Sequence, residues 1–167
     1  MSSALPAGAE ATALPGLLRY ELRRFADERG WFSEIRRESR LPNPTVQTNV
    51  SFSRAGVIRG LHYHERGQDD LFVCLQGTAR IVVLDRETGA TFVEDIGDDN
   101  PVAIYVPGVY AHGFEAITDL LFCYQVTREY DPSDPDEQGI PWNDPRVVDL
   151  WSTRSPLLSE RDRAAAL

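Results

Sequence analysis

Apolar and polar residues alternate along most of this chain with the period of two that β-strands produce. Strand-like runs of this kind cover residues 71–76, 79–85, 91–96, 102–106 and 120–127. Short segments rich in Gly, Pro, Asn and Asp separate them, as expected of turns. Many short strands at regular spacing predict an all-β protein, and a jelly-roll β-sandwich fits this spacing best.

The connection between the first two runs supports a specific prediction. Gly77 and Thr78 separate them, and a two-residue connection that contains glycine is typical of a tight β-hairpin. We therefore expect residues 71–76 and 79–85 to pair with each other.

The two ends of the chain lack this alternation. We expect residues 1–18 to form a flexible N-terminal segment and residues 19–167 to form a single jelly-roll domain. An acidic stretch at 131–145 is interrupted by prolines, and helical periodicity is found only in the last dozen residues. The sequence thus predicts a short, partly helical C-terminal tail.

Composition narrows the function. A chain of 167 residues with 42% hydrophobic content is long enough for one domain with a substantial core. Its net charge of −9 argues against nucleic-acid binding, although a local arginine cluster could hold a small phosphorylated ligand. All 17 basic residues are arginine, which excludes lysine Schiff-base chemistry and leaves His, Tyr, Cys or a carboxylate as candidate bases.

The cysteines and the N-terminus bear on location. Cys74 and Cys123 each lie within an apolar run, so we expect buried free thiols rather than a disulfide or a nucleophile. The N-terminal residues lack the basic start and apolar core of a signal peptide, and no run approaches the roughly 20 apolar residues that cross a bilayer. We expect a soluble cytoplasmic protein with no membrane partner.

All three histidines fall in two clusters flanked by Gly and Pro. His62 and His64 lie in the stretch 56–64, and His112 lies in the stretch 107–113. Histidine titrates near neutrality and is the commonest metal ligand in proteins. The two clusters therefore predict one site, built by folding, for either proton transfer or metal chemistry.

The chain also contains an ordered series of short motifs. They are Asp-Glu-Arg-Gly-Trp-Phe-Ser-Glu at 27–34, Gln-Thr-Asn at 47–49 followed by Ser51, Gly-Val-Ile-Arg-Gly-Leu-His-Tyr at 56–63, Asn100, Val-Pro-Gly at 106–108, Ala-His-Gly-Phe at 111–114, and Gly-Ile-Pro-Trp-Asn-Asp-Pro at 139–145. In this order they resemble the dTDP-4-dehydrorhamnose 3,5-epimerase family, over about residues 19–162. The resemblance implies a cupin-type jelly-roll homodimer that acts on a nucleotide-linked 4-keto-6-deoxy sugar without a metal or other cofactor.

The resemblance also implies roles for individual residues. His62 corresponds to the base that removes a proton next to the ketone, Asp162 to the carboxylate that orients it, and Tyr124 to the acid on the other face. Arg59 could hold the diphosphate or the developing enolate oxygen through its fork of donors. The family pattern places further residues around the nucleotide and sugar, although each could equally be an ordinary surface residue: Arg23, Arg29, Glu34, Gln47, Asn49, His112 and Tyr130.

Two departures from the family pattern keep other functions open. Asp70 stands where the family usually has a lysine, and His64 stands where it usually has a glutamine. Either Arg66 supplies the missing positive charge or the reaction has changed, because an anion would oppose the charge of an enolate.

The departures favour two alternatives. In the first, a divalent transition metal bound by His62, His64, Asp70 and His112 serves a cupin oxygenase or isomerase. In the second, the protein binds a sugar nucleotide without turning it over.

Overall fold

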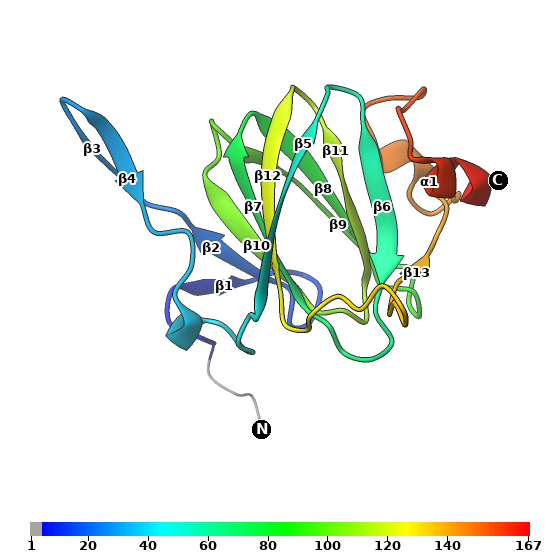
Figure 1. Ribbon diagram of the computed structural model, residues 1–167, viewed down its shortest axis with the longest axis horizontal. Helices are drawn as coiled ribbons and strands as arrows, with labels where there is room; N and C mark the ends of the chain where they lie inside the picture. Colours follow the sequence, from blue (N-terminus) through cyan, green and yellow to red (C-terminus); the bar gives the residue numbers. More distant parts are fainter. Residues whose placement is uncertain (1–4) are drawn as a thin grey trace.

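The protein consists of two facing antiparallel sheets and a projecting hairpin (Figure 1). Its structure, a computed structural model, describes residues 5–167. The six-stranded sheet contains, in spatial order, β1 (Ala9–Ala11), β2 (Leu18–Glu21), β10 (Val102–Val106), β7 (Asp70–Gln76), β12 (Leu120–Val126) and β5 (Gln47–Ser53). The five-stranded sheet contains β13 (Gln138–Gly139), β6 (Ile58–Tyr63), β11 (Ala111–Ala116), β8 (Thr78–Leu84) and β9 (Thr91–Gly97). The hairpin pairs β3 (Arg24–Asp27) with β4 (Gly30–Ser33). The predicted jelly-roll β-sandwich is confirmed.

Helical structure is limited to three short elements among the described residues. These are two 3₁₀ turns, η1 (Glu38–Arg40) and η2 (Val148–Leu150), and one α-helix, α1 (Glu160–Ala165). The helix lies in the predicted C-terminal tail. None of the helices in residues 5–167 is long and apolar enough to span a membrane.

The predicted hairpin at Gly77 is wrong. Strands β7 and β8 do not pair; β7 lies between β10 and β12 in one sheet, and β8 lies between β11 and β9 in the other. Gly77 has a φ of +88°, and a Cβ there would lie 2.3 Å from the carbonyl oxygen of Asp119. The glycine is therefore needed where the chain crosses from one sheet to the other, because any larger residue would collide with the neighbouring backbone.

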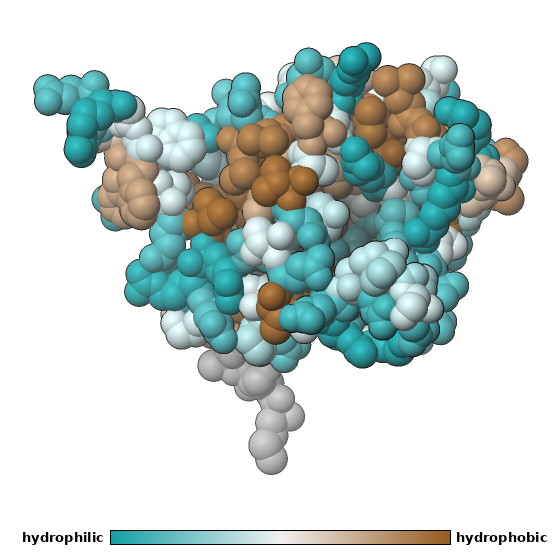
Figure 2. Space-filling view, viewed as in Figure 1, coloured by the Kyte–Doolittle hydropathy of each residue, from teal (hydrophilic) through white to brown (hydrophobic). Residues whose placement is uncertain are grey.

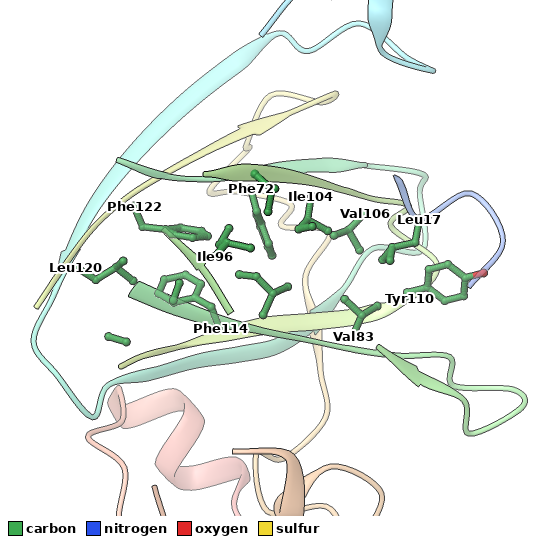
Figure 3. Close-up of a cluster of buried hydrophobic side chains, with 14 of the residues drawn as sticks. Leu17, Phe72, Val83, Ile96, Ile104, Val106, Tyr110, Phe114, Leu120 and Phe122 are labelled. Atoms are coloured by element: carbon green, nitrogen blue, oxygen red, sulfur yellow. The ribbon is translucent and has the colours of Figure 1, made fainter. Parts of the chain in front are cut away.

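The main core fills the space between the sheets (Figure 3). Phe72, Ile104 and Phe122 come from the six-stranded sheet and meet residues of the facing sheet such as Val83 and Phe114. The Phe114 and Phe122 rings stack across the interface with their centroids 4.1 Å apart. Burying each of these side chains stabilises the fold by about 1.5–3 kcal/mol, so the two sheets are held together mainly by this layer.

The N-terminal boundary differs from the predicted one. Strand β1 pairs with β2, and Leu14 and Leu17 are buried in the main core with exposed fractions of 2% and 0%. Residues 9–18 thus belong to the sandwich, because they complete the end of the six-stranded sheet. Residues 1–4, which the prediction also included, lie outside the described residues.

The C-terminal tail packs on the outer face of the five-stranded sheet. Val147 and Trp151 are buried there against Ile58 and Val82. The buried carboxylate of Glu115 accepts hydrogen bonds from the backbone N–H groups of residues 152 and 153. This anchoring brings helix α1 alongside strand β6.

Both cysteines are free thiols, as predicted. Cys123 is buried and Cys74 is half-buried. Burial, followed by the charge of Asp98, raises the pKa of the Cys74 thiol to about 11, which disfavours a nucleophilic thiolate.

Strand β5 and the projecting hairpin both carry exposed apolar side chains. Strand β5 is the last strand of its sheet, and Val50 and Phe52 on its outer face are 58% and 60% exposed. Phe25 and Phe32 are exposed on the projecting hairpin. Figure 2 shows apolar side chains gathered on the face around β5 and β12, beside a hollow in the surface.

Candidate active site

A cavity of about 640 Å³ lies between the two sheets. Its walls come from β5 and β12 of one sheet, β6 and β11 of the other, the segment 128–137 and helix α1. Of the residues predicted from sequence, those that line it are His62, His64, Asp70, His112, Tyr124, Asp162, Arg59, Gln47, Asn49 and Tyr130. Folding therefore joins the two histidine clusters in one site, as predicted.

A close approach of two strands sets the position of His62. In the antiparallel pairing of β6 with β11, His62 lies directly opposite His112. A Cβ on Gly113 would lie 2.4 Å from the carbonyl oxygen of Arg59, so only glycine allows the strands this close. The register brings His62 and His112 side by side in one wall of the cavity.

The His62 ring lies between two carboxylates. Its Nε2 is 3.4 Å from Oδ1 of Asp162, and its Nδ1 is 2.9 Å from Oε1 of Glu137. Glu137 is held in turn by Arg161, with an N–O distance of 2.9 Å. The predicted His62–Asp162 pair is thus present, and Glu137 is a second partner that the sequence reasoning missed.

The start of helix α1 fixes the Asp162 carboxylate. Ser159 is the N-cap residue, its hydroxyl accepts the N–H of Asp162, and it donates to the Asp162 side chain at 2.9 Å. The Ser159 hydroxyl thus satisfies an N–H that the helix leaves unpaired and also holds the Asp162 carboxylate. Asp162 therefore reaches His62 in a defined orientation.

The carboxylates control the charge of His62. Burial lowers the pKa of His62, but the hydrogen bonds with Asp162 and Glu137 outweigh burial and raise the pKa to about 9. The hydrogen bond with His62 lowers the pKa of Glu137 to about 2. His62 is therefore an imidazolium at neutral pH in this arrangement, which differs from the neutral base that the sequence argument required.

Tyr124 lies on the opposite wall of the cavity. It belongs to β12 in the six-stranded sheet, whereas His62 belongs to β6 in the five-stranded sheet. Burial, followed by the negative charge of Asp70, raises the pKa of Tyr124. The phenol stays protonated at neutral pH and can donate a proton from the side opposite His62.

Polar side chains line the cavity along β5 and beside it. Gln47 donates to Asn49 at 2.8 Å and accepts the backbone N–H of Tyr130 at 2.8 Å. The Arg59 guanidinium is held by the Ser53 hydroxyl, with its Nε 3.0 Å from Oγ. Arg59, Gln47, Asn49 and Tyr130 are therefore placed to contact a ligand.

The structure does not bring Arg23, Arg29 and Glu34 to the cavity of their own chain. They lie on or beside the projecting β3–β4 hairpin, which extends away from the sandwich (Figure 1). Arg29 pairs with Asp27, and Glu34 pairs with Arg37. The connections after β2 and β4 carry them away from this cavity, so their role as substrate contacts stays a prediction.

The predicted four-residue metal set is only partly assembled. His64, Asp70 and His112 lie together and are buried, whereas the His62 ring is engaged by Asp162 and Glu137. The His112 Nδ1 donates to the carbonyl oxygen of Tyr110, and its Nε2 faces Asp70 at 3.2 Å. His112 also lines the cavity, so its predicted contact with substrate stays a prediction.

Arg66 does not replace the missing lysine charge. It lines the cavity, but its guanidinium binds Asp134, with an N–O distance of 2.6 Å, and the carbonyl oxygen of the same residue. Asp70 instead lies among the histidines, where burial followed by the charge of His112 lowers the pKa of His64.

A β-sandwich that holds a histidine–carboxylate pair facing a tyrosine across one cavity defines a class of protein, the cupin-like enzymes that move protons at carbon. The sequence model of the dTDP-4-dehydrorhamnose 3,5-epimerase family matches residues 11–167. The chain belongs to this family, whose members are isomerases.

Individual relatives agree with this assignment. The spore coat polysaccharide biosynthesis protein SpsL of Bacillus subtilis is 36% identical over 148 residues, which is 84% of this chain and 97% of SpsL. NovW, a 4-keto-6-deoxy sugar epimerase from the novobiocin biosynthetic gene cluster of Streptomyces spheroides, superposes on this chain with a TM-score of 0.86 at 30% identity. The match covers 99% of this chain and 92% of the NovW chain. The epimerase RmlC of Legionella pneumophila was solved with dTDP-4-keto-L-rhamnose and has a TM-score of 0.83 at 29% identity. The match covers 95% of this chain and 91% of the RmlC chain.

Proposed function

We propose that this protein is a nucleotide-sugar epimerase of deoxysugar biosynthesis that inverts a carbon next to the ketone of a dTDP-4-keto-6-deoxyhexose. The observation that supports this most strongly is the placement of His62, backed by Asp162, and Tyr124 on opposite walls of one cavity. Inversion requires removal of a proton from one face of a carbon and return of a proton to the other. Membership of the family supports the substrate class.

In the proposed reaction, neutral His62 takes the proton from the carbon beside the ketone, and the electron pair moves to the ketone oxygen as an enolate. Asp162 orients the ring and stabilises the imidazolium that forms. The Tyr124 phenol then protonates the enolate carbon from the opposite face. Side chains supply both proton transfers, so we propose that no organic cofactor takes part.

Glu137 must give way before His62 can act as a base. A ring with a carboxylate on each nitrogen is protonated, and a protonated ring cannot accept a proton. Glu137 lies on the cavity wall beside Asp134 and Asp136, so a diphosphate entering there would repel it. We propose that substrate binding displaces Glu137 and lowers the pKa of His62.

We also propose a homodimer. Within one chain the hairpin carries Arg23, Arg29 and Glu34 away from the cavity and exposes apolar side chains on its strands. Insertion of this hairpin at the open edge of a second copy would cover its apolar surface and bring these polar residues to the partner's cavity. Cytoplasmic location remains a prediction from the sequence.

The test is exchange of solvent deuterium into a dTDP-4-keto-6-deoxyhexose. We expect exchange and inversion by the unmodified protein, and loss of both in His62→Ala by about 10²–10⁴-fold, the usual contribution of a general base. Tyr124→Phe should still exchange deuterium but should fail to invert the centre. Mass spectrometry and NMR of the product separate these outcomes.

The matched control is Tyr63→Phe, a neighbouring tyrosine on β6 that stacks under Arg86 and does not line the cavity. It should turn over normally. Absence of exchange in the unmodified protein would favour the binding-only alternative, and normal inversion by His62→Ala would exclude its role as the base.

A further inference from the structure

A second cluster of titratable side chains lies in the cavity wall. It consists of His64 after β6, Asp70 at the start of β7 and His112 on β11, with exposed fractions of 6%, 5% and 3%. One ligand atom from each of the three lies within 4.8 Å of the others. The residues come from both sheets, so the cluster exists only because the sandwich is closed.

Both imidazoles are oriented through Nδ1. The Nδ1 of His112 bonds to the carbonyl oxygen of Tyr110 at 2.9 Å, and that of His64 bonds to the carbonyl oxygen of Asp136. A carbonyl oxygen can only accept, so each Nδ1 carries the proton. In the neutral rings, each Nε2 therefore presents a lone pair.

These lone pairs meet a carboxylate. The Nε2 of His112 is 3.2 Å from Oδ2 of Asp70. The side-chain nitrogen of Gln68 lies 3.1 Å from the Nε2 of His64 and 3.0 Å from Oδ1 of Asp70, and thus serves both. Among the hydrogen bonds of residues 5–167, no other side chain donates a proton to the contact between the His112 Nε2 and the Asp70 Oδ2. Two buried acceptors that face each other are costly unless a cation or a proton lies between them.

We propose that His64, Asp70 and His112 bind one divalent transition-metal ion. Two imidazole nitrogens and one carboxylate form a donor set that Zn, Fe, Mn, Co and Ni accept, and three protein ligands leave coordination positions open. Donation of the other ring N–H to a backbone carbonyl is the arrangement that orients metal-binding histidines.

The open positions would face the cavity that His62 and Tyr124 line. If the proposed function holds, the ketone oxygen of the substrate is the ligand that fits there, because a cation stabilises the enolate charge that forms on that oxygen. This catalytic role rests on the proposed function. The metal site itself does not.

The experiment measures metal content in the full chain, purified without chelator and also stripped and titrated with Co²⁺ and Zn²⁺. We expect about one ion per chain, and a Co²⁺ absorption spectrum typical of nitrogen and oxygen ligands. Asp70→Asn and His112→Gln should weaken binding by about 100-fold or more, since even the loss of an outer partner costs up to that much. The control is His62→Ala, which should keep the ion although it loses turnover.

Titration of the unmodified protein decides the proposal even if a variant fails to fold. The metal site would be overturned if the unmodified protein bound neither ion with a defined stoichiometry, or if Asp70→Asn bound metal as well as the unmodified protein. A proton between His112 and Asp70 would then account for their contact. Deuterium exchange without bound metal would leave the proposed function intact, whereas bound metal without exchange would support the site and contradict that function.

Discussion

At the scale of single residues, the environment of His62 decides what this site can do. Position 62 could be picked out from the sequence, because histidine is rare in the chain and the motif around it resembles that of a known family. The carboxylate of Glu137 could not be picked out, because it lies in an acidic stretch for which the sequence predicted little regular structure. Only the pairing of β13 with β6 brings that stretch to the ring, where Gly139 lies opposite His62.

Glu137→Gln is expected to make His62 a better base at low pH. Removal of one of the two anions lowers the pKa of His62 from about 9, by roughly 1–3 units for a close charge pair. Activity that needs neutral His62 rises as pH passes this pKa, so the acidic limb of the kcat/KM profile should move to lower pH. The profile and an NMR titration of the imidazole measure the shift.

Glu129→Gln is the matched control, because Glu129 also lines the cavity but is not an ion-pair partner of His62. Its profile should follow that of the unmodified protein. An acidic limb that stays in place in Glu137→Gln would contradict the electrostatic account of His62.

At the scale of elements, alternation predicted the strands well but not which strands pair. All five predicted runs match strands, β7, β8, β9, β10 and β12, to within about one residue at each end, as is usual for element boundaries. The connection at Gly77 was misread, because a glycine with positive φ serves equally in a hairpin and in a crossing between sheets. The choice depends on long-range pairing with β10, β11 and β12, which no local pattern records.

Gly77→Ala should destabilise the fold more than Gly89→Ala. Both glycines have positive φ, +88° and +76°, but the added Cβ at position 77 would lie 2.3 Å from a backbone oxygen, whereas the one at position 89 has no atom within 4 Å. We expect Gly77→Ala to cost roughly 1–3 kcal/mol more, the usual cost of overpacking. Urea unfolding measures this, and equal midpoints for the two variants would contradict the close approach.

At the scale of the whole molecule, the single chain leaves apolar surface and a projecting hairpin unaccounted for. Val50 and Phe52 on the edge strand β5 are exposed, and edge strands of this kind invite pairing with another chain. The family resemblance led us to expect that Arg23, Arg29 and Glu34 contact substrate, and the fold separates them from their own cavity. The homodimer proposed above would accommodate both observations.

Phe52→Asp should convert the protein from a dimer to a monomer and lower its activity. A buried charge without a partner at an apolar interface is strongly unfavourable, so association should weaken by several kcal/mol. Light scattering coupled to size-exclusion chromatography measures the mass. Val93→Asp, an exposed apolar residue on β9 in the other sheet, should leave the mass unchanged. A monomeric and fully active unmodified protein would contradict the dimer.

The sequence by itself determined the strand content, the absence of lysine chemistry, the family and the positions of the candidate base and acid, because these depend on local periodicity, composition and short motifs. The tertiary structure decided the sheet to which each strand belongs, the charge on His62 and the convergence of His64, Asp70 and His112. These depend on which distant side chains come within a few ångströms of each other, and the electrostatic energy of a site is set by those distances and by burial.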